Sequence, residues 1–207
     1  MNEPDIPVLT VGHSNHTIDD FIGLIKGAGI TAIADVRSAP YSRYQPQFNK
    51  ERLERSLKEH GVAYVFLGRE LGARSDEPSC YVDGRVQYDR LAALPKFKEG
   101  VQRVLDGAGK HRVALMCAER EPLECHRTLL VGRALVELGS EVAHLHADGV
   151  VEPHGQAMRR LVRMVGLPED DLFRSSEELV AEALSIQSKR VAYQDEKMAN
   201  EAGAEHT

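Results

Sequence analysis

The segment from Met116 to Thr128 carries the side chains best suited to chemistry in this sequence. Its reactive groups are two thiols, a carboxylate, an imidazole and a guanidinium, namely Cys117, Cys125, Glu119, His126 and Arg127. A thiol becomes a useful nucleophile when nearby cations or the positive end of a helix favour its thiolate. We therefore expect Cys117 to be a nucleophile, with Glu119 and His126 moving protons. The alternative is that Cys117 is a small buried hydrophobic residue at a strand end.

Groups that could bind an anion accompany this thiol. Arg37 and Arg127 can form a bidentate clamp for an oxyanion, and a helix that opens near Thr128 presents unpaired backbone N–H groups. The other residues that we expect to bind substrate follow earlier strands: Gly12, His13, Ser14 and Ser42. Asp35 and Cys125 are expected to give structural support, Asp35 by holding Arg37.

Two cysteines and a histidine in one loop also raise the alternative of a metal site. The conceivable ligands are Cys117, Cys125, His126 and His13. However, the Cys-x7-Cys spacing lacks the short Cys-x2-Cys pattern of common zinc sites, so we expect neither a metal nor another cofactor. The chain has three cysteines, which cannot all pair internally, and free thiols are therefore the default.

Alternating strand and helix patterns must position these residues. Apolar runs predict strands at residues 8–11, 30–36, 62–67, 113–116 and 141–145. Helical patterns cover residues 18–28, 50–60, 88–105 with an interruption near Pro95, 128–138, 156–165 and 176–187. The stretch from residue 68 to 87 is expected to be a long loop, and loops of that length are usually functional or disordered.

This pattern predicts an α/β protein with a mostly parallel central sheet of about five strands, flanked by helices on both faces, and a C-terminal helical extension. We expect a single α/β domain over residues 1–167, followed by a helical extension and a disordered tail over residues 168–207. Carboxyl ends of parallel strands share one edge of a sheet, and ligands usually bind there. His13, Arg37, Cys117 and the pair His144 and His146 should therefore converge at that edge.

Composition limits the classes of protein that this chain can belong to. With 207 residues, 42% hydrophobic and 28% charged, the sequence is typical of a globular protein. No apolar run reaches the roughly 20 residues that span a bilayer, and the N-terminus does not resemble a signal peptide. We therefore expect a cytoplasmic protein without a membrane partner. The net charge of −6 gives no general attraction to nucleic acid.

Several motifs together resemble the domain-of-unknown-function 488 family over about residues 8 to 165. They are Gly12-His13-Ser14, Asp35-Val36-Arg37-Ser38-x-Pro40-x-Ser42, Leu67-Gly68-x-x-Leu71-Gly72, Tyr88, Cys117-Ala118-Glu119 and Cys125-His126-Arg127. Ala192-Tyr193-Gln194 is similar to the C-terminal extension of that family. The resemblance implies an α/β fold and a polar site that contains cysteine, but it brings no established reaction.

A looser resemblance is to rhodanese-like domains, in which Asp-Val-Arg ends one strand and a catalytic cysteine ends a later one. Asp35-Val36-Arg37, Cys117 and Arg127-Thr128 follow that order. The loop differs, because nine residues separate Cys117 from Arg127, whereas rhodanese loops are shorter. This resemblance is one of architecture, which does not establish function.

The sequence leaves three functions open. The first is a thiol-dependent transferase or hydrolase that acts on a small anionic or nucleotide-like ligand. The second is a protein that binds or processes nucleic acid through the stretch from Arg37 to Arg55, where arginine, lysine and tyrosine alternate. The third is a non-catalytic interaction module, in which the helix at residues 176–187 packs on a partner or forms a homodimer.

Overall fold

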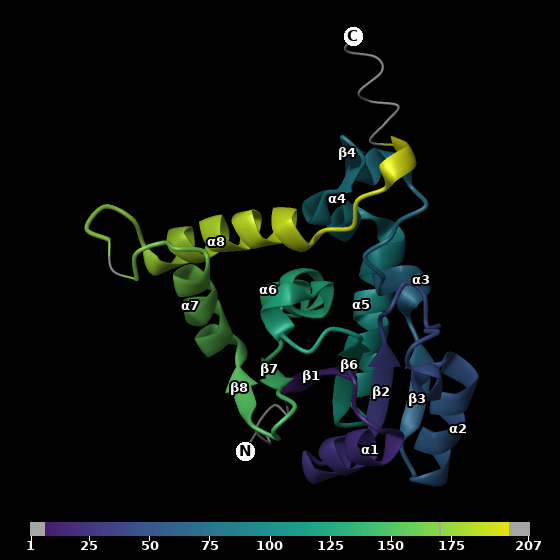
Figure 1. Cartoon of the computed structure of the whole chain (residues 1–207). Coiled ribbons are helices and arrows are strands. Elements are labelled where there is room, and N and C mark those ends of the chain that lie inside the picture. Colours follow the sequence, from purple (N-terminus) through teal and green to yellow (C-terminus); the bar gives the residue numbers. More distant parts are fainter. Residues whose placement is uncertain (1–6, 170, 199–207) are drawn as a thin grey trace.

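A six-stranded sheet forms the centre of the computed structural model, which describes residues 7–169 and 171–198 (Figure 1). Its strands are β1 (Val8–Gly12), β2 (Ala32–Asp35), β3 (Ala63–Phe66), β6 (Val113–Cys117), β7 (Val142–Leu145) and β8 (Val151–Pro153). Their order is β3-β2-β6-β1-β7-β8, and only β8 runs antiparallel to its neighbour. The predicted α/β class with a mostly parallel sheet is confirmed.

Helices cover both faces of the sheet because side chains of the central strands alternate between two buried clusters. Ala114 and Met116 face α1 (Ile18–Gly27) and α2 (Lys50–Glu59). Val113, Leu115 and Cys117 face the opposite layer. The helices of that layer are α4 (Tyr88–Ala93), α5 (Pro95–Ala108), α6 (Arg133–Glu137), α7 (His154–Met164) and α8 (Ser176–Val191). Cys117 thus points to the side of the sheet where the later helices pack.

The predicted loop from residue 68 to 87 is an ordered connection. It contains α3 (Gly68–Leu71), the 3-10 turn η2 (Pro78–Cys80) and a hairpin of β4 (Tyr81–Val82) and β5 (Arg85–Val86). Asp83 and Gly84 both have positive φ, which is the conformation that a two-residue hairpin turn requires. The sequence indicates only a long loop here because these elements are too short to give a periodic pattern.

The predicted helix at residues 128–138 begins differently from a regular α-helix. Residues Arg127–Gly132 form a π-helix, η4, and α6 continues directly from it. At Gly132 a Cβ atom would lie 3.1 Å from the carbonyl oxygen of Arg127, so the absence of a side chain permits the wider turn. Two further 3-10 turns, η1 (Pro46–Phe48) and η3 (Pro122–Glu124), lie in the loops after β2 and β6.

The C-terminal helix α8 crosses over the later helices and leads the chain back toward the β4–β5 hairpin (Figure 1). A capping box of Ser175 and Glu178 starts this helix. After it, the backbone N–H of Val86 donates to the carbonyl of Tyr193 over 3.0 Å, and that of Asp195 donates to Gly84 over 2.7 Å. The C-terminal segment is therefore paired with the hairpin up to Asp195. The disordered tail that the sequence predicts falls partly on residues 199–207, outside the described residues.

Among the helices of the described residues, none is both long enough and apolar enough to span a bilayer.

Candidate functional site

Two thiols and an imidazole meet where β6 ends. Cys117 is the last residue of β6, and η3 turns the chain so that Cys125 and His126 return to it. The Nδ1 atom of His126 lies 3.8 Å from the Sγ atom of Cys117 and 3.8 Å from that of Cys125. All three residues are buried. We call these three residues the thiol–imidazole cluster.

The protonation of His126 follows from its second contact. Its Nε2 atom lies 2.9 Å from the carbonyl oxygen of Val36. A carbonyl oxygen only accepts hydrogen bonds, so Nε2 carries a proton, and in the neutral ring the lone pair of Nδ1 is directed toward the sulfur atoms. Burial opposes the charged form, but the charge and hydrogen bond of Cys125 and the bond to Val36 raise the pKa of His126 above its ordinary value. This ring can therefore accept a thiol proton or donate an electron pair.

The two thiols have opposite electrostatic surroundings. Burial raises the pKa of Cys117, and the adjacent Cys125 adds to this shift. Burial also opposes ionisation of Cys125, but its hydrogen bond with Cys117 and the charge of Arg127 lower the pKa of Cys125 below its ordinary value. The backbone N–H of Arg127 points at the Cys125 sulfur over 3.5 Å. The thiolate is thus favoured at Cys125, whereas the sequence predicts a depressed pKa at Cys117.

Glu119 and Arg127 lie beside the cluster in different ways. The Cys125 thiol lies 3.0 Å from Oε2 of Glu119, within reach for proton transfer. Arg127 is 1% exposed, and its guanidinium donates to the carbonyl oxygens of Glu119 (2.6 Å) and Arg120 (3.2 Å). These bonds hold the cysteine loop in shape. The structure does not place this guanidinium on the surface of a cavity.

A pocket of about 320 Å³ opens onto the cluster, and we call it the thiol pocket. Both thiols, His126 and Glu119 line it. The other polar groups of its lining are two guanidiniums, two phenols, a carboxyl group and a hydroxyl: Arg37, Arg74, Tyr88, Tyr193, Glu124 and Ser38. Its volume is at the small end of the range for pockets that bind small molecules. The pocket thus gathers two guanidiniums, two sulfur atoms and the carboxyl groups of Glu119 and Glu124.

Arg37 is oriented by a network of buried groups. Asp35 accepts from Nε of Arg37 over 2.9 Å and from its NH2 group over 2.6 Å, and Tyr64 donates to the same carboxylate over 2.8 Å. Nε2 of His13 lies 3.3 Å from NH1 of Arg37, and the imidazole stacks on Phe48 at 4.3 Å. Burial, followed by the charge of Arg37, lowers the pKa of His13 to about 4. His13 is therefore neutral at pH 7.

Of the seven residues predicted to bind substrate, only Arg37 lines the thiol pocket. His13, Arg127 and the four residues below do not. Gly12 lets β1 approach the cysteine loop, because a Cβ atom there would lie 2.0 Å from the carbonyl oxygen of Glu119. The N–H of Ser14 donates to Ala118 over 2.9 Å. The hydroxyl of Ser42 accepts from two N–H groups of its own loop. The hydroxyl of Thr128 is buried without a hydrogen-bond partner.

His144 and His146 lie at the same sheet edge but belong to other networks. His144 lies between the Thr10 hydroxyl (2.8 Å) and His154 (3.1 Å). His146 contacts Glu152 over 2.8 Å. The order of the strands brings the loops after β2, β6 and β1 together, whereas β7 lies beyond β1. All of these residues thus lie toward one edge of the sheet, but only His13, Arg37 and Cys117 come from the adjacent strands β1, β2 and β6, while His144 and His146 contact other partners.

Sequence reasoning did not assign Arg74 and Tyr193 to the site. The guanidinium of Arg74 lies 4.4 Å from the centre of the Tyr193 ring. Both approach Cys117 and Cys125 through chain segments that are distant in sequence. The available signals were the similarity of Ala192-Tyr193-Gln194 to the family extension and the position of Arg74 just after the Leu67 to Gly72 motif.

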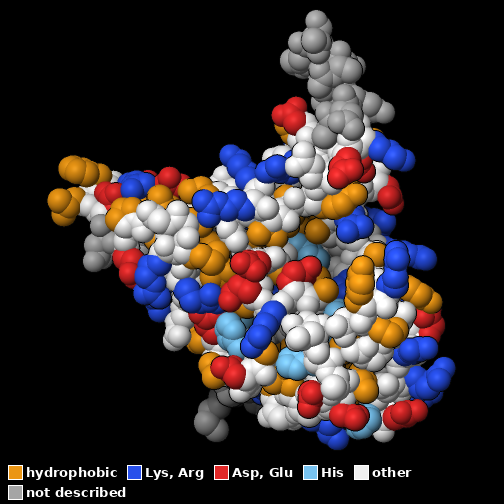
Figure 2. Space-filling model, in the orientation of Figure 1, with side chains coloured by type: hydrophobic (Ala, Val, Ile, Leu, Met, Phe, Trp, Pro, Cys, Tyr) orange, Lys and Arg blue, Asp and Glu red, His pale blue; other side chains and the backbone are white. Residues whose placement is uncertain are grey.

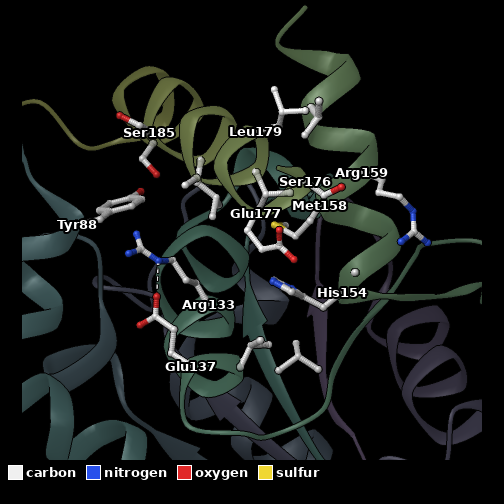
Figure 3. Close-up of a pocket in the computed structure, with 18 of the residues that line it drawn as sticks. Tyr88, Arg133, Glu137, His154, Met158, Arg159, Ser176, Glu177, Leu179 and Ser185 are labelled. Atoms are coloured by element: carbon white, nitrogen blue, oxygen red, sulfur yellow. Dashed lines mark hydrogen bonds and ion pairs between the residues drawn. The ribbon is translucent and has the colours of Figure 1, made fainter. Parts of the chain in front are cut away.

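A larger groove of about 1540 Å³ lies between α6, α7 and α8 (Figure 3). Arg133 binds Glu137 over 2.7 Å on one side of it, and His154 points into it from the start of α7. Tyr88 lines both this groove and the thiol pocket. The groove contains neither thiol of the cluster, so the residues predicted for catalysis belong to the smaller pocket.

The basic stretch after β2 exposes aromatic side chains. Tyr41 and Tyr44 are 70% and 86% exposed, and Arg43 between them is exposed as well. Exposed rings beside a cation are what base stacking requires. On the face shown in Figure 2, however, acidic and basic side chains are interspersed and do not form one basic surface. The nucleic-acid alternative stays a prediction.

Fold and site together define an α/β protein with a thiol–imidazole cluster at the carboxyl edge of its parallel sheet. Comparison with known families gives a match to "Domain of unknown function DUF488" over residues 17–134. The chain therefore belongs to the DUF488 family, as the motifs predict. Neither a curated protein nor a solved structure matches the chain.

Proposed function

We propose that this protein is a thiol-dependent enzyme that acts on a small anionic substrate bound in the thiol pocket. The observation that carries the proposal is the composition of that pocket. A thiol pair, an imidazole and a carboxylate line it together with the guanidiniums of Arg37 and Arg74. Such a site can bind an anion and present a nucleophile to it.

The contacts assign a role to each group. His126 takes the proton of Cys125 at Nδ1, and the sulfur gives an electron pair to the electrophilic atom of the substrate. The bond from that atom to its leaving group breaks, and the leaving group takes the bonding pair together with the proton that His126 received. Glu119, whose Oε2 accepts from the Cys125 thiol over 3.0 Å, orients that thiol. Cys117 stabilises the sulfur of Cys125. That sulfur also accepts a hydrogen bond from the backbone N–H of Arg127. These roles exchange those that the sequence suggests for the two cysteines.

Two alkylating reagents of opposite character test the proposal. Iodoacetate is an anion and iodoacetamide is neutral, and both react with thiolates. We divide the rate with iodoacetate by the rate with iodoacetamide. We expect this ratio to be about tenfold higher for the protein than for a free thiol in solution, which corresponds to about 1.4 kcal/mol. Mass spectrometry should place the label on Cys125, and a Cys125→Ala variant should lose the selective reaction.

Arg74 allows a matched control, because this exposed guanidinium lines the pocket without a buried ion pair. Arg74→Gln should lower the preference for iodoacetate, whereas Arg52→Gln, at an exposed position on α2, should not. If the wild-type protein reacts with iodoacetate no faster, relative to the free thiol, than with iodoacetamide, the pocket does not select anions and the proposal fails. Labelling of Cys117 alone would restore the original assignment of the nucleophile.

A further inference from the structure

The thiol–imidazole cluster also has the geometry of a metal site. Its three donor atoms all lie within 4.8 Å of one another, and both sulfur atoms are 3.8 Å from Nδ1 of His126. In a tetrahedral zinc site with Zn–S near 2.3 Å and Zn–N near 2.0–2.1 Å, neighbouring donor atoms lie about 3.5–3.8 Å apart. The side chains therefore need little movement to surround one cation.

The contacts behind the donor atoms favour the same use. Histidines that bind a metal through one ring nitrogen usually donate the other N–H to a carbonyl or carboxylate, which fixes the ring. His126 does this with the carbonyl oxygen of Val36 at 2.9 Å. On the sulfur side, the N–H of Arg127 points at Cys125 and can stabilise a metal-bound thiolate. These contacts orient the His126 ring and the Cys125 sulfur for metal binding.

The charge of the donor atoms and the access to them also favour a bound cation. Two thiolates would neutralise a divalent cation, which lowers the cost of burying it. The three ligands leave a fourth position, and all three residues line the thiol pocket. Glu119 is the nearest carboxylate, with Oε2 at 3.0 Å from the Cys125 sulfur. Three protein ligands with an open fourth position are typical of reactive zinc sites, and structural sites usually have four.

We propose that Cys117, Cys125 and His126 bind a divalent zinc ion, with the fourth position open to the thiol pocket. Within residues 7–169 and 171–198, no other set of three such donors is gathered this closely. The short spacing of common zinc motifs is absent because η3 folds the Cys-x7-Cys segment back on itself. The inference needs only the donor atoms and does not rest on the reaction proposed above, which uses the same Nδ1 and sulfur atoms and therefore belongs to the metal-free protein. A bound zinc ion would occupy the sulfur atoms and suppress their alkylation.

Metal binding can be measured on the whole protein without knowledge of a substrate. Metal-free protein is titrated with Zn²⁺ in competition with a coloured chelator, and Co²⁺ serves as a spectroscopic substitute. We expect one equivalent of zinc, together with the thiolate-to-cobalt absorption and the intense visible bands of a tetrahedral sulfur site. Cys117→Ser, Cys125→Ser and His126→Gln should each weaken binding by about 100-fold or more.

Cys80 is the matched control, because it is fully buried but lies outside the cluster. Cys80→Ala should bind zinc like the wild type. If a cluster variant does not fold, protection in the wild-type protein decides instead: zinc should block alkylation of Cys117 and Cys125. Absence of stoichiometric binding, cobalt spectra without sulfur bands, or binding that survives loss of the cluster residues would overturn the inference.

The two proposals fail separately. A metal-free protein with anion-selective thiols that takes up no zinc would refute the metal site and leave the proposed function standing. A protein that binds zinc through the cluster, but whose metal-free thiols do not discriminate iodoacetate from iodoacetamide, would refute only the proposed function.

Discussion

At the scale of single residues, Gly12 controls how closely the first loop approaches the cysteine loop. The N–H of His13 donates to the carbonyl of Cys117 over 2.9 Å, and any Cβ atom at Gly12 would collide with the backbone of Glu119. Backbone atoms in a packed core cannot move aside as the end of a flexible side chain can. The position of Glu119 therefore depends on a residue that offers no chemistry of its own.

Replacement of Gly12 tests this dependence. Gly12→Ala should lower the free energy of unfolding by about 1–3 kcal/mol, the typical cost of overpacking, and should slow alkylation of Cys125 because the loop must shift. The control is Gly23→Ala in α1, where no atom lies within 4 Å of an added Cβ. That variant should be neutral or stabilising by about 0.5–1 kcal/mol. Urea unfolding gives both values, and equal effects would contradict the role of Gly12.

Residue types and spacing could predict part of the site. Cys117, Cys125 and His126 are brought together by one loop, so their proximity follows from local sequence. The approach of Arg74 to Tyr193 could not be predicted, because it depends on the pairing of β5 with the segment around Tyr193. The partners of Arg127 could not be predicted either, because a guanidinium can bind an anion or donate to backbone carbonyl oxygens.

At the scale of elements, hydrophobic periodicity predicted the helices and strands well where these are long or fully buried. β1 and β6 are buried at every position, and α1 starts at residue 18 as predicted, directly after Thr17, whose hydroxyl accepts from the N–H of Asp20 over 3.1 Å. β8 was missed because it has three residues, none of them fully buried. The π-helix η4 has the same apolar residues as an α-helix, so no pattern could distinguish the two.

The packing of α8 makes the C-terminal extension part of the main hydrophobic core. Leu179 and Leu184 belong to the cluster that contains Cys117 and Leu123, and Gln187 donates to the carbonyl of Leu123 over 2.9 Å. Because η3 carries that carbonyl, α8 supports the turn that returns Cys125 to Cys117. An extension of this kind should unfold together with the sheet.

Truncation of one buried leucine in α8 tests that cooperativity. Leu179 is 2% exposed, and Leu179→Ala should cost about 2–5 kcal/mol through lost burial and a residual cavity. Leu172→Ala, at a position that is 96% exposed, should stay within about 0.5 kcal/mol of the wild type. Circular dichroism in urea should show a single transition for both variants. Two separate transitions would mean that α8 is an independent unit.

At the scale of the whole molecule, buried neutral histidines make stability depend on pH. The pKa of His13 is about 4 in the folded protein because of burial and the charge of Arg37, against about 6.5 in an unfolded chain. Between these values the unfolded state binds the proton and the folded state does not. The stabilisation is therefore complete above about pH 6.5 and is lost as the pH falls toward 4.

This linkage predicts a loss of about 2 kcal/mol from His13 alone between pH 7 and pH 5. Urea unfolding at both pH values measures the total loss, to which the buried His144, with a pKa lowered to about 3 chiefly by burial, also contributes. His13→Gln should show a smaller loss than the wild type. His111→Gln, at an exposed position, should leave it unchanged. An equal loss in all three proteins would show that His13 is not a source of acid sensitivity.

Val191 and Tyr193 line part of the thiol pocket, so the pocket is complete only when this late segment of the chain has folded. Chains emerge from the ribosome with the N-terminus first, so Cys117 and Cys125 are synthesised well before this segment. Until residue 195 is available to pair with the hairpin, the two sulfur atoms lack part of their enclosure. Proteolysis between α7 and α8 followed by loss of the C-terminal piece would recreate that open state. The pocket can therefore close only after residue 195 has left the ribosome.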